Sequence, residues 1–68
     1  MRAADLDPVP RRLLKHAKRI DPNPTKIEPR DEAAADELVR RGLVDRVPMF
    51  GGRFDGVAIT DAGREACR

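Results

Sequence analysis

The stretch LVDRVPMFGGRFDGVAIT, residues 43–60, decides the fold because two adjacent glycines separate two runs with the composition of β-strands. Gly51 and Gly52 suit a two-residue turn of type I′, which needs positive φ at both central positions. These residues predict a hairpin with Arg46 on its first strand and Arg53 at its tip. The two arginines either face a partner or pair across the strands with aspartates of the hairpin.

The two strands of this hairpin differ in where they can lie within a sheet. Pro48 has no N–H to donate and therefore confines the first strand to an edge. On the second strand Val57 and Ile59 alternate inward, whereas Phe54 is out of phase with them. This shift in phase predicts a β-bulge at Gly56.

The segment DPVPRRLLKHAKRIDP, residues 7–22, predicts an amphipathic helix. Asp7 can cap its N-terminus, and Pro22 is incompatible with its continuation. Leu14 falls outside the apolar stripe and is a candidate contact in a homodimer. The stripe recurs at helical spacing and consists of Val9, Leu13, Ala17 and Ile20.

The opposite side of this helix carries five basic residues and no acid: Arg11, Arg12, Lys15, Lys18 and Arg19. They span about three turns, which brings them close enough to act together on a phosphate backbone. The alternative is a solvated face without a ligand. His16 lies on the same side and has no second His or Cys nearby, so no metal site is expected.

Residues 31–41 predict the second helix. Asp31 can cap its N-terminus, and Gly42 suits the left-handed position that ends a helix. If Gly42 takes that position, Leu43 folds back on Leu38. The apolar residues of this helix are expected in the core: Ala34, Ala35, Leu38 and Val39.

Two shorter elements complete the chain. Between the helices, a proline-rich segment leaves room for one short strand at residues 25–28, with Ile27 directed inward. After the hairpin, Thr60 can cap a short final helix that Gly63 weakens. Two alanines of this helix are expected to face the core: Ala62 and Ala66.

A pattern runs from the second predicted helix to the last: Leu38, Val39, Gly42, Leu43 and Val44, followed by Ile59, Thr60, Gly63 and Arg64. It resembles the second half of a winged-helix domain, as found in small bacterial and phage regulators. The resemblance covers residues 33–66, about half of the chain. It implies an α+β fold with a helix, a short strand, a helix, a two-stranded wing and a short C-terminal helix. That family usually has two helices between the first strand and the wing, whereas this chain has room for one.

In the family, the helix before the wing enters the major groove of DNA, and the wing contacts the backbone or the minor groove. The resemblance assigns these roles to residues 31–41 and to residues 50–53. The first of these segments has four acids against two arginines, and phosphates repel acids. Its i, i+4 spacing predicts ion pairs between Asp36 and Arg40 and between Glu37 and Arg41. The helix is then a self-paired face, a DNA-reading surface or a contact for a basic protein.

Composition restricts the class of function. The 68 residues carry fourteen basic and twelve acidic side chains, so the net charge of +2 does not by itself indicate a nucleic-acid-binding protein. The single cysteine, Cys67, cannot form an internal disulfide, and we expect a cytoplasmic protein. No apolar run approaches the roughly 18 residues of a membrane span, so no membrane contact is expected.

The chain also lacks the motifs of an enzyme. No phosphate-cradling loop opens a helix, and no nucleophile has a positioned base, so we expect no enzyme activity and no cofactor. The two aromatic residues, Phe50 and Phe54, are expected in the core. Residues 1–6 carry no pattern and are expected to be flexible, and residues 7–68 are expected to form one domain.

Together these features predict a small DNA-binding regulator. The first helix and the wing would supply phosphate contacts, and the second helix any base contact. The predicted DNA-binding residues are Arg11, Arg12, Lys15, Arg19, Arg40, Arg41, Arg46 and Arg53. The alternative is a protein-binding module, such as a phage-encoded inhibitor or adaptor of a host complex, that uses the acidic helix. A third alternative is a subunit that works only as a homodimer.

Overall fold

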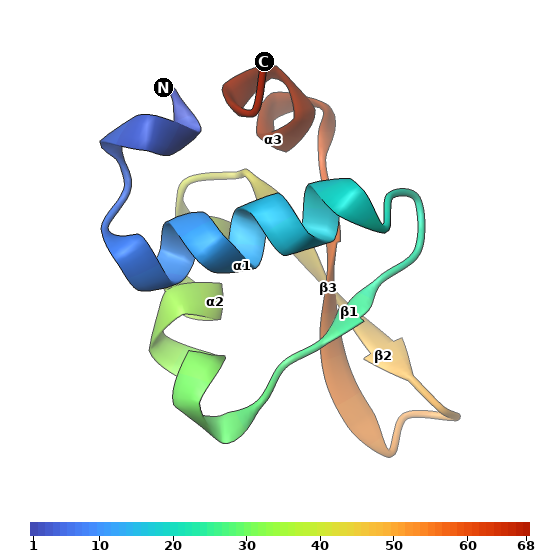
Figure 1. Ribbon diagram of the computed structural model, residues 1–68. Coiled ribbons are helices and arrows are strands. Elements are labelled where there is room, and N and C mark those ends of the chain that lie inside the picture. Colours follow the sequence, from blue (N-terminus) through green and yellow to red (C-terminus); the bar gives the residue numbers. More distant parts are fainter.

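The computed structural model describes residues 1–68 and contains three α-helices and one three-stranded antiparallel sheet (Figure 1). The elements in chain order are α1 (Pro8–Arg19), β1 (Thr25–Lys26), α2 (Glu32–Arg40), β2 (Val44–Met49), β3 (Phe54–Ile59) and α3 (Asp61–Ala66). Two short 3-10 turns, η1 (Ala3–Asp5) and η2 (Pro29–Asp31), precede α1 and α2. The predicted α+β class and the predicted order of elements are confirmed.

The sheet has the order β1-β3-β2, with β3 in the centre. Pro48 therefore lies on an edge strand, as predicted. The register between β2 and β3 continues without interruption from Val44 opposite Ile59 to Met49 opposite Phe54. The predicted bulge at Gly56 is wrong, because Phe54 simply belongs to the other face of a regular strand.

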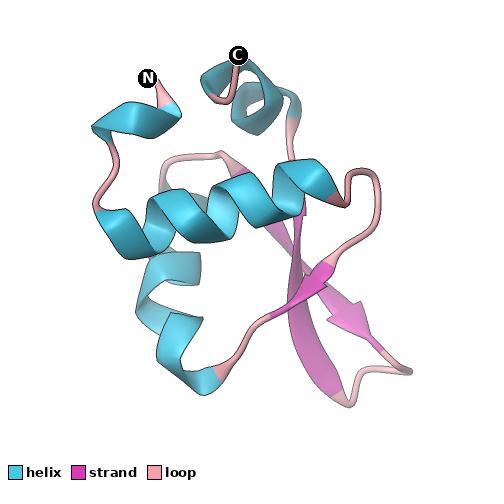
Figure 2. Cartoon of the chain, in the orientation of Figure 1, coloured by secondary structure: helices cyan, strands magenta, loops and turns pink.

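The hairpin between β2 and β3 projects away from the helices (Figure 2). Its loop has four residues, 50–53, and not the predicted two, because Met49 and Phe54 form the last pair of the ladder. The residues with positive φ begin at Phe50, one residue before the predicted turn: φ is 53° at Phe50, 68° at Gly51 and 87° at Gly52. The N–H of Gly52 donates to the carbonyl of Met49 at 3.1 Å and closes this turn.

The core lies where α1 packs against α2 and β3. Leu14 is fully buried there, so its predicted exposure as a homodimer contact is wrong. Val9, predicted to be buried, is exposed instead. The buried side of α1 is rotated from the predicted stripe because the helix packs on several elements at once, η1 and α3 included. Leu13 and Ala17 are buried as predicted.

The first six residues, for which the sequence shows no pattern, include a short helical turn. Residues 3–5 form η1, and the side chains of Ala3 and Leu6 are buried in the core cluster. The N-terminal segment thus packs against α1 and covers part of its apolar surface. On the other side of α1, Ile27 is buried beside β1, as predicted.

Local hydrogen bonds fix the end of α2 and the start of α3, and a longer-range bond joins the two. Gly42 has φ of 74°, its N–H donates to the carbonyl of Val39 at 2.9 Å, and the N–H of Leu43 donates to the carbonyl of Leu38 at 3.0 Å. These two bonds form a Schellman motif and confirm the predicted helix end. The Thr60 hydroxyl accepts from the N–H of Gly63 at 3.1 Å, as predicted for a cap, and donates to the carbonyl of Gly42 at 2.7 Å.

Within α3 only one of the two alanines faces the core. Ala66 is buried as predicted, whereas Ala62 is exposed. Gly63 is buried instead of Ala62, because α3 packs against the Leu43 backbone and the Ile59 side chain at the position of Gly63.

Candidate nucleic-acid interface

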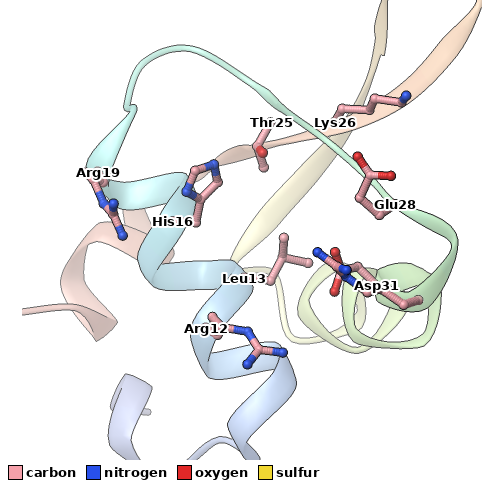
Figure 3. A pocket seen from close by; sticks show the side chains of 9 residues that line it. Arg12, Leu13, His16, Arg19, Thr25, Lys26, Glu28 and Asp31 are labelled. Atoms are coloured by element: carbon pink, nitrogen blue, oxygen red, sulfur yellow. The ribbon is translucent and has the colours of Figure 1, made fainter.

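A groove of about 730 Å³ lies between α1, β1 and the segment that leads to α2 (Figure 3). Three polar side chains of α1 line it at positions i, i+4 and i+7, which share one side of a helix: Arg12, His16 and Arg19. The other lining residues are Leu13, also on α1, and Thr25, Lys26, Glu28, Arg30 and Asp31. A single apolar residue among nine makes this a polar groove, open to a charged ligand.

The groove gathers cations that have no ion-pair partner within the chain. Arg12, Arg19, Lys26 and Arg30 take part in none of the ion pairs of the structure. Two carboxylates also line the groove, so its formal charge is +2 with His16 neutral. A concave surface with one dominant sign of charge concentrates ions of the other sign, so this groove attracts anions.

The basic face of α1 is divided between two sides of the helix. Arg12 and Arg19 line the groove next to β1, whereas Lys15 and Lys18 line a second groove of about 410 Å³ against the N-terminal segment and α3. Cys67 lies in the second groove, and burial raises the pKa of its thiol despite the opposing effect of Lys18 and Lys15. A raised pKa keeps this thiol protonated, which is the opposite of an activated nucleophile. Arg11 lines neither groove.

Arg46, a predicted DNA contact, is held by acids of its own chain. Its guanidinium donates to Asp36 and, at 3.3 Å, to Glu32, both on α2. Asp55 on β3 lies 3.9 Å away on the other side. The hydrogen bonds that Arg46 donates to Asp36 and, to a smaller extent, to Glu32 raise its pKa. Arg46 therefore joins α2 to the sheet and does not extend toward a partner.

Arg40 and Arg41, the predicted base contacts, both pair with Glu37. Arg41 does so through Nε at 3.0 Å, as predicted, and Arg40 through Nη2 at 3.4 Å. The predicted pair between Asp36 and Arg40 is wrong, because Asp36 is taken by Arg46. Arg40 and Arg41 thus share the one carboxylate of Glu37, and Asp36 is paired with Arg46.

Arg53 lies at the exposed tip of the hairpin and makes no ion pair. Phe50 and Phe54 flank it and are 64% and 44% exposed, so their predicted place in the core is wrong. Phe54 lies outside the core because the register puts it on the face opposite to Val57 and Ile59, and Phe50 lies in the loop beyond the last pair of the ladder. The tip therefore combines a free cation with two exposed aromatic rings.

Sequence reasoning missed two members of the groove, Lys26 and Arg30. A signal was available for Lys26, because it alternates with the buried residues Thr25 and Ile27 and must point to the opposite face. No comparable signal exists for Arg30. It lies in η2, and the loop between β1 and α2 places η2 beside the groove.

The residues that resemble a winged helix have structural roles here. Arg64 forms a two-point pair with Asp21, with Nε to Oδ2 at 2.7 Å and Nη2 to Oδ1 at 2.8 Å, and Asp61 lies 2.7 Å from its Nη1. The hydrogen bonds that Arg64 donates to Asp21 are the main cause that raises the pKa of Arg64. This pattern of residues thus specifies how α3 packs.

Free and paired charges are distributed unequally over the molecule. Of the fourteen basic residues, five are in ion pairs: Arg40, Arg41, Arg46, Arg64 and Arg68. Seven of the twelve acids are their partners, which leaves nine cations and five acids unpaired. The unpaired cations lie mainly on α1, around the groove and at the hairpin tip.

No group of His, Cys, Asp and Glu side chains is placed to hold a metal ion. None of the helices has the length and apolar character needed to cross a membrane. Comparisons of this chain with protein-family models, with curated proteins and with solved structures find no match.

Proposed function

We propose that this protein is a small DNA-binding regulator that holds DNA phosphates in the groove between α1 and β1. The observation that carries the proposal is the gathering of four unpaired cations around one groove: Arg12, Arg19, Lys26 and Arg30. Phosphate contacts from Arg and Lys supply most of the affinity in non-specific DNA binding. Lys15 and Lys18 on the other side of α1 add to the attraction at longer range.

In this proposal α1 takes the place that the winged-helix resemblance gives to α2. Arg40, Arg41 and Arg46 are engaged by acids within the chain, so they have less to offer a phosphate. The same pairs weaken the protein-binding alternative, because Glu32, Asp36 and Glu37 are the acids that a basic partner would need. The free cations thus favour a polyanion.

The test is the salt dependence of DNA binding, followed by fluorescence anisotropy on a labelled duplex. Four phosphate contacts give a slope of about −3.6 for log affinity against log salt concentration. The double variant Arg12→Gln/Arg19→Gln should lower the magnitude of this slope by about 1.8. Both side chains are exposed, so the substitutions leave the core intact.

The matched control is Arg40→Gln, which removes an arginine that is already paired with Glu37. It should leave the slope unchanged. If the wild-type protein at micromolar concentration binds neither duplex nor single-stranded DNA at about 50 mM salt, where phosphate contacts are strongest, the proposal is wrong.

A further inference from the structure

The hairpin tip exposes an aromatic pair that the core does not use. The ring centroids of Phe50 and Phe54 lie 5.7 Å apart, with the ring planes at 88°. Phe50 is the only residue other than glycine with positive φ, a conformation that a bulky side chain rarely adopts. A large apolar side chain kept in this conformation, and exposed to water, does not contribute to folding by burial.

The aromatic pair is continuous with the basic groove through one side chain. Lys26 lines the groove, and its Nζ lies 4.0 Å from the centroid of the Phe54 ring. This contact follows from the register, which pairs Lys26 with Gly56 and makes Phe54 its diagonal neighbour on the same face. Arg53 adds an unpaired cation at the tip. A path of free positive charge therefore leads from α1 to two exposed rings.

We propose that the aromatic pair stacks on an unpaired base, and that the DNA held by the groove is single-stranded next to the hairpin. The inference deepens the proposed function and rests on it. Proteins that bind single strands combine a charged groove that follows the backbone with aromatic side chains on which bases stack. In a duplex the faces of the bases are covered by their neighbours, and only the edges can be read in the grooves.

Charge on α2 favours the single strand over the duplex as well. To enter a major groove, α2 would have to bring Asp31, Glu32 and Asp36 between two phosphate backbones. A single strand that runs along the groove toward the hairpin meets Asp31 beside the four free cations of the groove, but it avoids Glu32 and Asp36, which do not line the groove. The same acids do not oppose the aromatic pair, because the register places Phe54 on the face of the sheet opposite to the core.

The first measurement compares one DNA sequence as a single strand of about 12 nucleotides and as a duplex, at equal salt. The single strand should bind more tightly. Phe50→Ala should lower its affinity roughly tenfold, the range expected for the loss of one stacked base, and leave duplex affinity unchanged. Circular dichroism of the variant should match the wild type, because the Phe50 side chain is largely exposed.

The second measurement uses the absence of tryptophan and tyrosine from the chain. Phe50→Trp keeps a stacking surface and introduces the only strong emitter, so its fluorescence should be quenched by the single strand while affinity is retained. Ala62→Trp is the matched control. Ala62 is exposed on α3, at the opposite end of the molecule from the hairpin tip (Figure 1), and its emission should not change.

Several outcomes would overturn the inference. If Phe50→Ala lowers duplex affinity and single-strand affinity equally, the ring inserts between base pairs of a duplex and does not stack on an unpaired base. Tighter binding of an RNA strand of the same sequence would make DNA the wrong ligand. If DNA binds but Phe50→Ala has no effect, the inference fails and the proposed function stands. If neither form of DNA binds the wild type, both fail.

Discussion

Gly63 is the residue at which helix propensity and packing disagree. Glycine is the poorest helix former after proline, yet it lies inside α3. A Cβ at this position would lie 2.6 Å from Cγ1 of Ile59 and closer still to the carbonyl oxygen of Leu43. The backbone carbonyl cannot rotate away as a flexible side chain would. Glycine is therefore required because α3 approaches the chain after α2 so closely.

Gly63→Ala should destabilise the protein. Alanine improves helix propensity by about 1 kcal/mol, but overpacking against a fixed backbone costs about 1–3 kcal/mol, and we expect a net loss of up to about 2 kcal/mol. Urea denaturation followed by circular dichroism measures the change. The control Ala62→Gly acts on propensity alone at an exposed position and should cost about 1 kcal/mol or less. A more stable Gly63→Ala would mean that the close approach does not exist.

Among the elements, α2 and the β2–β3 hairpin are joined by the charges around Arg46. Asp36 and Glu32 come from α2, Asp55 comes from β3, and the guanidinium lies among them. This arrangement explains why a helix with so many acids is stable beside the sheet. It also removes one arginine from the set that can bind DNA.

Arg46→Gln should lower the melting temperature and leave the salt dependence of DNA binding unchanged. Stability falls because three carboxylates lose the cation between them, and the loss should shrink at high salt, which screens exposed charges. Salt titration by fluorescence anisotropy measures the binding. Arg19→Gln is the control, and it should lower the magnitude of the slope by about 0.9. The same reduction in Arg46→Gln would mean that Arg46 contacts phosphate.

Features set by neighbouring residues could be predicted from the sequence, and features set by distant ones could not. The end of α2 at Gly42 and the cap of α3 at Thr60 could be predicted because the bonds that form them reach only three to five residues along the chain. The partners of Arg46 lie ten and fourteen residues away, so its spacing in the sequence does not reveal them. The burial of Leu14 could not be predicted for the same reason, since it depends on the packing of η1, α2 and α3 around α1. For the site, helical spacing is enough to place Arg12 and Arg19 on one side of α1. The groove itself could not be predicted, because its other walls depend on the path of the loop between α1 and α2.

At the scale of the whole molecule, the pair between Asp21 and Arg64 joins the segment after α1 to α3. The Asp21 side chain is 19% exposed and is held by two hydrogen bonds from the guanidinium. The hydrogen bonding from Arg64 lowers the pKa of Asp21, with desolvation opposing and the charges of Arg64 and Lys18 assisting. Protonation of the Asp21 carboxylate would therefore weaken the contact between α3 and the segment that follows α1.

This pair predicts how stability depends on pH. Because the pKa of Asp21 is lower in the folded than in the unfolded chain, its contribution is complete above the unfolded value, about pH 4, and is lost as pH falls through the folded value. Thermal melts followed by circular dichroism should show that Asp21→Asn melts lower than wild type at pH 7 and that the difference shrinks below about pH 4. Asp45→Asn is the control, since Asp45 is exposed and unpaired, and it should follow the wild type throughout. A constant difference between Asp21→Asn and wild type at every pH would mean that the pair contributes through shape alone and not through the charge of Asp21.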